Sequence, residues 1–556
     1  PEPLRVTPSR ALLCLGAIAV AAVLLWQRPP SIDDVVDYRT TKEQAVECAG
    51  HAGALPSGGG AAAFHIVVQP QEGFRSWARD SPREEGGAPD GFDTTAAEYL
   101  VRHGLAMQKL ADVMRTRIPA ATWMVRAYKP QQKEEHFVEV DPRTDRTIGY
   151  HKYQSETNPG ARLDQTQAQA IATAAFAKYG VDGRAFDVKE ALAFQQPNRR
   201  DWLFHFEERQ PIAAEGHRRV SVRVAGSEVT QFTTTIKIPD SVYRDEAKET
   251  LLNVVLGLVR LGAALFALAF IIAGFVIAAR RGHFPWRRAL RWTLVLAVIP
   301  IAAAAVRWPL SLFEYQTTQQ WQTFITANLV RTIFGVGLRL GGIFLAIAGI
   351  DIAYPHALDL RIRAARARIG RAALVAALTA LALMAVARAA AAMIEQHFPS
   401  TMSIDALRVP QSVALPLPSL WAIGNAIVTA LLASAAAGLF VYAIRAFGRT
   451  KWLPDVLGVA LLFFLTLDSN VTAKELPSTI AATLVAALLI WALVRFVLGA
   501  NLLAYPLAIV IGQLLLGASA LMQNHRADLM INGAVMLAAA VAVALWAALP
   551  REPRLA

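Results

Sequence analysis

The second half of the chain is a succession of apolar runs that starts at Leu251 and ends near Leu549. A helix needs roughly 20 mainly apolar residues to cross the hydrocarbon core of a bilayer, and most of these runs approach or exceed that length. They are too long and too numerous for the core helices of a soluble protein of this size. The pattern predicts nine transmembrane helices here, at residues 251–279, 292–306, 324–354, 372–394, 420–444, 456–467, 480–496, 502–522 and 529–549.

A tenth span is expected at the N-terminus. Residues 1–10 are basic and residues 11–26 are apolar, as in a signal peptide. No small-x-small cleavage pattern follows, because the next residues are Gln27, Arg28, Pro29 and Pro30. We therefore expect residues 1–28 to form an uncleaved transmembrane anchor with a cytoplasmic N-terminus.

The distribution of charge favours a membrane protein over a nucleic-acid-binding one. Charged residues make up 18% of the chain, whereas soluble proteins carry about 25%. The net charge is +12, but the basic residues gather beside the apolar runs, as the positive-inside rule predicts for cytoplasmic loops. They fall on alternate loops: Arg280 to Arg291, Arg361 to Arg371, Arg445 to Lys451, Arg495, and Arg551 with Arg554. This predicts a multi-pass membrane protein with about ten spans, both termini cytoplasmic and the soluble domain on the other side.

Residues 29–248 are predicted to form a periplasmic α+β domain in which one order of elements occurs twice. Helical periodicity covers 94–117 and again 166–179, where Gly180 ends the helix. Alternating, strand-like segments follow the two helices, at 123–128, 136–140 and 147–153, and then at 186–194, 202–207, 218–224 and 229–236. We expect two helix-plus-antiparallel-sheet units, similar to PepSY-like modules, each covering one sheet face with its helix. The polytopic helical domain then occupies residues 249–556.

Three arginines interrupt the predicted spans: Arg331 and Arg339 lie in one, and Arg388 lies in the next. An ionised side chain near the bilayer centre costs at least about 2.5–3.5 kcal/mol, so such residues usually face a partner or a wet cavity. Arg331 and Arg339 are eight residues apart, about two turns, and therefore lie roughly on one helix face.

Two interpretations of these arginines stay open. They form an intramembrane anion, lipid-headgroup or substrate site, or they snorkel and pair structurally with Asp351, Glu395 or Asp455. Glycines on the first span would also permit close helix packing; they are Gly335, Gly337, Gly341 and Gly342.

Several short motifs occur in order along most of the chain. In the outer domain they are K-P-Q-Q-K-E-E at 129–135, N-R-R-D-W at 198–202, V-R-V-A-G-S-E-V at 222–229 and K-I-P at 237–239. In the membrane half they are W-P-L at 308–310, Y-Q-T-T-Q at 315–319, V-R-F-V at 494–497 and N-L-L-A-Y at 501–505. Together they resemble long bacterial members of the CPBP family, the CAAX-processing and bacteriocin-processing type of intramembrane metalloprotease.

The catalytic motifs of that family are missing. The resemblance implies a Glu-Glu-x-x-x-Arg helix, a Phe-x-x-x-His helix and a His-x-x-x-Asn helix, whose side chains hold a metal that activates water. The Glu-Glu pairs of this chain, at 84–85, 134–135 and 207–208, all lie in the outer domain. Where the acidic pair would fall, the span after Pro418 has Ala435 and Ala436.

The histidines and cysteines do not replace these motifs. The histidines of the membrane half lack the Phe and Asn partners; they are His283, His356, His397 and His525. Cys14 and Cys48 lack metal-ligand spacing. The sequence therefore assigns no catalytic, metal-binding or cofactor-binding residue.

Three functional hypotheses follow. The first is a non-catalytic relative of the protease that acts as a scaffold or partner-binding subunit of a membrane complex. The second is a transporter or a lipid- or anion-handling protein that uses Arg331, Arg339 and Arg388. The third is an active metalloprotease with a non-standard site, for example around His525. The expected partners are membrane lipids and other membrane or periplasmic proteins, and not nucleic acid.

Overall fold

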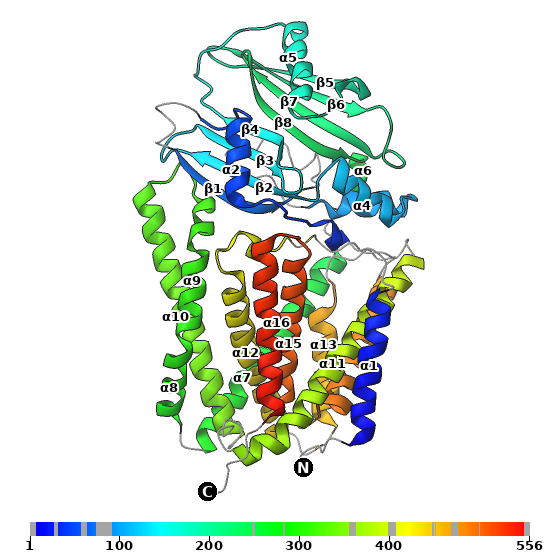
Figure 1. The fold of residues 1–556 in the computed structure, drawn as a ribbon, viewed down its shortest axis with the longest axis vertical. Coiled ribbons are helices and arrows are strands. Elements are labelled where there is room, and N and C mark those ends of the chain that lie inside the picture. The colour runs from blue at the N-terminus through cyan, green and yellow to red at the C-terminus, as the bar shows by residue number, and fades with distance from the viewer. Residues whose placement is uncertain are drawn as a thin grey trace.

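The computed structural model describes residues 7–26, 32–56, 64–73, 92–246, 251–281, 284–354, 363–397, 407, 409–447, 450, 452–468, 476–499 and 501–549. The chain has two parts: an antiparallel sheet with short helices, and a body of long helices below it (Figure 1). Some of the predicted basic-loop residues lie outside the described residues, namely Arg361, Arg449, Lys451, Arg551 and Arg554.

The eight strands form a single sheet in the order β1-β2-β3-β4-β8-β7-β6-β5, and every neighbouring pair is antiparallel. The strands are β1 (His65–Glu72), β2 (Ala121–Tyr128), β3 (Glu135–Asp141), β4 (Arg146–Tyr153), β5 (Phe186–Gln195), β6 (Arg200–Glu208), β7 (His217–Ala225) and β8 (Glu228–Lys237). The seven predicted strands are all present. The two expected sheets are joined, however, because Tyr150 and His151 of β4 lie opposite Phe232 and Gln231 of β8.

Strand β1 was not predicted. Its segment contains Pro70, which argues against a central strand because proline cannot donate a ladder hydrogen bond. The structure accommodates Pro70 because β1 lies at the edge of the sheet and pairs only with β2.

Short helices cover one face of the sheet. They are α2 (Lys42–His51), α3 (Thr94–Arg102), α4 (Met107–Thr116) and α5 (Gln165–Lys178), and α6 (Asp240–Glu246) follows the last strand. The predicted helix at 94–117 is two helices, because Gly104 has a φ of +95° and ends the first one. Helix α2 lies outside the predicted helices, and a capping box of Thr41 and Gln44 starts it.

The core of the sheet domain lies between these helices and the sheet. Alternate strand residues point into it, and Trp123, Val138, Phe204, Val222 and Phe232 are almost fully buried there. Helix α2 lies over the first half of the sheet and α5 over the second (Figure 1). On the opposite face, Met124 and Phe137 of the first half of the sheet pack against Phe313 of the helical body.

Nine helical segments of the described chain are long and apolar enough to cross a membrane. They are α1 (Pro8–Trp26), α7 (Leu251–Arg281), α8 (Trp286–Leu296) continued by α9 (Val298–Ser311), α10 (Trp321–Ala353), α11 (Arg363–His397), α12 (Pro418–Phe447), α14 (Leu476–Ala492) continued by a π-helical turn (Leu493–Leu498), α15 (Ala504–Met522) and α16 (Ala527–Ala548). The remaining predicted span is α13 (Leu453–Thr466), which has 14 residues and is shorter than a bilayer crossing needs. The multi-pass helical architecture is confirmed.

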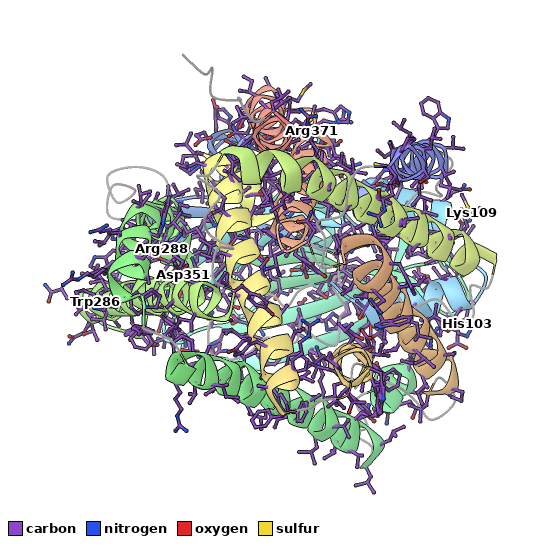
Figure 2. All side chains as sticks on the ribbon, turned by 90° about the horizontal axis from the view of Figure 1, so that it is seen from below. His103, Lys109, Trp286, Arg288, Asp351 and Arg371 are labelled. Carbon is purple, nitrogen blue, oxygen red and sulfur yellow. The ribbon has the colours of Figure 1, made fainter. Side chains whose placement is uncertain are left out.

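Basic side chains mark the end of the body that points away from the sheet. Arg288 Nη1 lies 2.9 Å from Asp351 Oδ1, and Arg371 donates to the carbonyl of Ala548 over 3.0 Å. All of these residues except Ala548 are labelled in the view from below (Figure 2). Helix α1 begins and α16 ends at this same end (Figure 1).

Candidate functional site: the junction between the sheet and the helical body

The first contact between the two parts is built around Arg126 of β2. Its guanidinium donates to Glu135 Oε2 over 2.9 and 2.7 Å, and to the carbonyl of Phe313 over 2.5 Å. Phe313 belongs to a short 3₁₀ turn, η4 (Leu312–Glu314), between α9 and α10. Thr317, after this turn, donates to the other carboxylate oxygen of Glu135 over 2.6 Å. An ion pair of the sheet thus binds the loop between two membrane helices.

Aromatic rings surround this ion pair. The Arg126 guanidinium lies 4.6 Å from the ring centre of Tyr128, which itself lies 5.1 Å from the ring of Tyr315. His65 of β1 stacks on Trp321, the first residue of α10, with ring centres 4.6 Å apart. Cation–π and aromatic contacts strengthen when they are desolvated, as those of Arg126, Tyr128 and Tyr315 are. The cluster thus attaches the turn between α9 and α10, and the first residue of α10, to β1 and β2.

A second contact joins the N-terminal part of the sheet domain to the turn between α15 and α16. Asn524, which is 1% exposed, accepts a 2.7 Å hydrogen bond from the backbone N–H of Tyr38. Arg526 donates to the carbonyls of Thr40 and Val413, each over 2.9 Å. Because backbone groups far apart in sequence meet on two side chains, this turn acts as a clamp on the sheet domain.

The motifs that carry the family resemblance contribute to the first contact. The loop at 129–135 ends in Glu135, and the motifs at 308–310 and 315–319 lie on either side of η4. None of Arg126, Tyr38, Asn524 and Arg526 was predicted as a site residue, because the groups that they contact across the junction are far away in sequence. The nearest signal was an arginine inside an otherwise apolar predicted strand, Trp123 to Tyr128.

The predicted intramembrane arginines do not form one cluster. Arg331 and Arg339 are on α10 and Arg388 is on α11, and Figure 1 shows these helices on opposite sides of the body. All three side chains are exposed on the helical body. Arg331 lies 3.4 Å from Glu314 Oε2 and donates to Asn328 Oδ1 over 2.9 Å.

The acidic residues considered as partners for these arginines are engaged elsewhere. Asp351 pairs with Arg288, and Asp455 lies 3.8 Å from Arg495. The side chain of Glu395 lies outside the described part of the chain. Both pairs therefore join helix ends on the side of the body away from the sheet, and neither compensates an arginine in the middle of a span.

A polar cluster on the second half of the sheet combines side chains from three strands. His205 Nδ1 lies 2.9 Å from Ser221 Oγ, and His205 Nε2 lies 4.0 Å from Glu190 Oε2. Burial, with Arg219 nearby, lowers the pKa of His205 to about 4. A serine, a base and a carboxylate in this order are also the parts of a nucleophilic site. Ser221 and His205 are each 4% exposed, however, so a substrate does not reach them, and we assign the cluster to sheet stability.

This cluster predicts a loss of stability in acid. Because the pKa of His205 is lower in the folded chain than the ordinary value of 6.5, the unfolded chain takes up the proton first. The free energy of unfolding should therefore fall as the pH drops from about 6.5 to about 4, by up to about 3 kcal/mol. Chemical denaturation in detergent should show a smaller fall in His205→Gln. His525→Gln, at an exposed position, is the control, and an equal fall in both variants would contradict the assignment.

The described residues contain no group of three or more His, Cys, Asp or Glu side chains placed to hold a metal ion. His525 is exposed at the turn between α15 and α16, and Ala435 is a buried residue of α12. His283 and His356, and the side chain of His397, lie outside the described residues.

Comparisons of the chain with models of known families, with curated proteins and with solved structures gave no match.

Proposed function

We propose that this chain is a non-catalytic, CPBP-protease-like protein of the bacterial inner membrane that acts as a scaffold or partner-binding subunit of a membrane complex. In this proposal the sheet domain lies in the periplasm and presents a binding edge, while the helical body anchors it. The order of the family-like motifs supports the relationship, and Ala435 and Ala436 at the place of the acidic pair support loss of the protease chemistry.

The observation that carries the proposal is the free edge of β5. This strand is the last in the sheet, and no described strand pairs with its outer edge. Edge strands normally carry charges or bulges that prevent pairing with another chain, and the first half of β5 has both: Lys189, Glu190 and a register shift between Val188 and Glu190.

The second half of β5 lacks this protection. Residues 191–195 read Ala-Leu-Ala-Phe-Gln, without a charge or a bulge, and Leu192 is 45% exposed. An extended segment of a partner can add to such an edge through main-chain hydrogen bonds, with alternate side chains supplying specificity. We assign residues 191–195 as the partner-binding edge.

The two contacts with the helical body give this edge a fixed place. Arg126 and Arg526 fasten the sheet domain at β2 and at the turn before α16, and β5 lies at the opposite, outer end of the sheet (Figure 1). The periplasmic location rests on the basic side chains at the other end of the body, among them Arg288 and Arg371, which the positive-inside rule assigns to the cytoplasm. A partner bound at β5 would be held at a set distance from the membrane.

The test is purification of the full chain from its native membrane in mild detergent, with mass spectrometry and metal analysis of one sample. We expect a stoichiometric protein partner that is lost in Leu192→Lys, where a charge would be placed on the binding edge. Ala170→Lys, which adds the same charge at an exposed position of α5, should retain the partner.

Three other results would overturn the proposal. A lone protein with one bound zinc would favour the active metalloprotease, and tightly held lipid or anion without a partner would favour the transporter or lipid-handling alternative. A partner retained by Leu192→Lys would remove the β5 edge as its binding site.

A further inference from the structure

The middle of α10 is uncovered, although both of its ends are packed. Phe324 and Asn328 are buried near the sheet, and Ile343 to Gly349 are largely buried near the opposite end. Between them, residues 329–342 include no buried side chain. No part of the described chain fully covers these residues, which make up about four helical turns.

The uncovered part and the packed parts of α10 share one face of the helix. Residues Asn328, Gly335, Gly342 and Gly349 recur every seven positions, so they share one side of the helix. A Cβ placed on Gly349 would lie 2.9 Å from Leu439 of α12, and one on Gly342 would lie 3.4 Å from Leu432 of α12. A Cβ on Gly335 meets nothing within 4 Å. The seam between α10 and α12 is therefore closed in its inner half and open at Gly335.

Arg331 and Arg339 lie four residues before and four residues after Gly335, so they flank the open part of the seam. Their depths differ. The Arg288–Asp351 pair marks the inner end of the body, and a rise of 1.5 Å per residue places Arg339 roughly 18 Å and Arg331 roughly 30 Å from Asp351 along α10. With a hydrocarbon core about 30 Å thick, Arg331 reaches the outer boundary and Arg339 lies near the middle.

The two arginines also differ in their partners. Arg331 contacts Glu314 and Asn328, which suits its place at the boundary. Arg339 makes no hydrogen bond or ion pair with any residue that the structure describes, and it is exposed. A guanidinium near the bilayer centre requires an anionic or strongly polar partner, so this one must be supplied from outside the described chain.

We infer that the open seam of α10 binds a transmembrane helix of a partner membrane protein that carries a carboxylate at the depth of Arg339. A lipid phosphate suits the site less well, because it stays at the edge of the core, roughly 15 Å from its centre. A carboxylate on a helix is brought to the required depth by the helix itself, and Gly335 allows the two backbones to approach closely. This inference rests on the proposed partner-binding function and specifies the chemistry of a membrane partner.

The test uses a defined probe in place of an unidentified partner. The full chain would be reconstituted in phosphatidylcholine vesicles with a labelled polyleucine transmembrane peptide that has one central glutamate, and association would be measured by energy transfer. We expect this peptide to associate about tenfold more tightly than one with a central glutamine, because an interhelical polar contact in a bilayer contributes roughly 1–2 kcal/mol in model peptides. Arg339→Leu should abolish the difference, and Gly335→Leu should weaken association of both peptides by filling the seam.

Arg388→Leu is the matched control, since it removes an exposed arginine of α11 on the other side of the body and should change nothing. Equal association of the two peptides, or an unchanged difference in Arg339→Leu, would overturn the inference. Loss of peptide association when phosphatidylglycerol is included in the same vesicles would identify lipid as the occupant instead and overturn the inference. Thermal unfolding of Arg339→Leu should match the native chain, and a clear drop would mean that Arg339 has a structural role within the chain. The β5-edge experiment probes a different surface, so failure of one test does not imply failure of the other.

Discussion

Replacing Arg126 with methionine is expected to lower the free energy of unfolding by about 3–5 kcal/mol, because Glu135 would remain as a buried charge without its partner. The two side chains are only 7% and 6% exposed, so water cannot take the place of the guanidinium. Chemical denaturation in detergent would measure the loss. Hydrogen exchange should rise in the loop after η4, since the carbonyl of Phe313 also loses its donor.

Two further variants separate the burial of this pair from its charge. Lys133→Met breaks an exposed pair with Glu156 on the neighbouring loop and should cost less than about 1 kcal/mol. The double variant Arg126→Met with Glu135→Met leaves no unpaired charge and should recover much of the stability. If Arg126→Met costs no more than Lys133→Met, the junction does not depend on this pair.

Replacing Arg526 with methionine is expected to cost about 2–4 kcal/mol, because the largely buried carbonyls of Thr40 and Val413 would lose charge-assisted hydrogen bonds. The Arg526 side chain is 9% exposed, so it is part of the interface and not of the surface. The loss should be local. Hydrogen exchange should rise at Tyr38 and its neighbours, whereas β6 and β7 should stay protected.

The neighbouring residue provides the control for this variant. His525 lies in the same turn and is exposed, so His525→Gln should leave both stability and exchange near those of the native chain. Equal effects of the two substitutions would show that the conformation of the turn, and not the guanidinium, holds the sheet domain.

Elements that depend on local periodicity could be predicted well from the sequence. The strands from Ala121 to Lys237 are short segments rich in β-branched and aromatic residues, and the long apolar runs give membrane-length helices. β1 escaped prediction because its place at the sheet edge, which makes Pro70 acceptable, is a property of the whole sheet. The break between α3 and α4 depends on the positive φ of Gly104, which a run of helix-forming residues conceals.

Partners of charged side chains were harder to predict than the helices that carry them. Asp351 and Asp455 were considered as partners of arginines in the middle of spans, yet they pair with Arg288 and Arg495 at helix ends. Such pairing depends on how helices far apart in sequence are arranged side by side. The same reason hid Arg126, whose acceptor at Phe313 is 187 residues away.

The clamp at the turn before α16 has a consequence for biosynthesis. Tyr38 and Asn524 are separated by 486 residues, so the ribosome delivers the acceptor only when almost the whole chain has been made. N-terminal domains fold first during synthesis, so the sheet can fold before the membrane body is complete. Insertion of α15 and α16 would then complete the attachment as the last step. A chain truncated before α15 would keep its sheet but lose the contacts of Asn524 and Arg526, while the contacts of β1 and β2 with the rest of the body would remain.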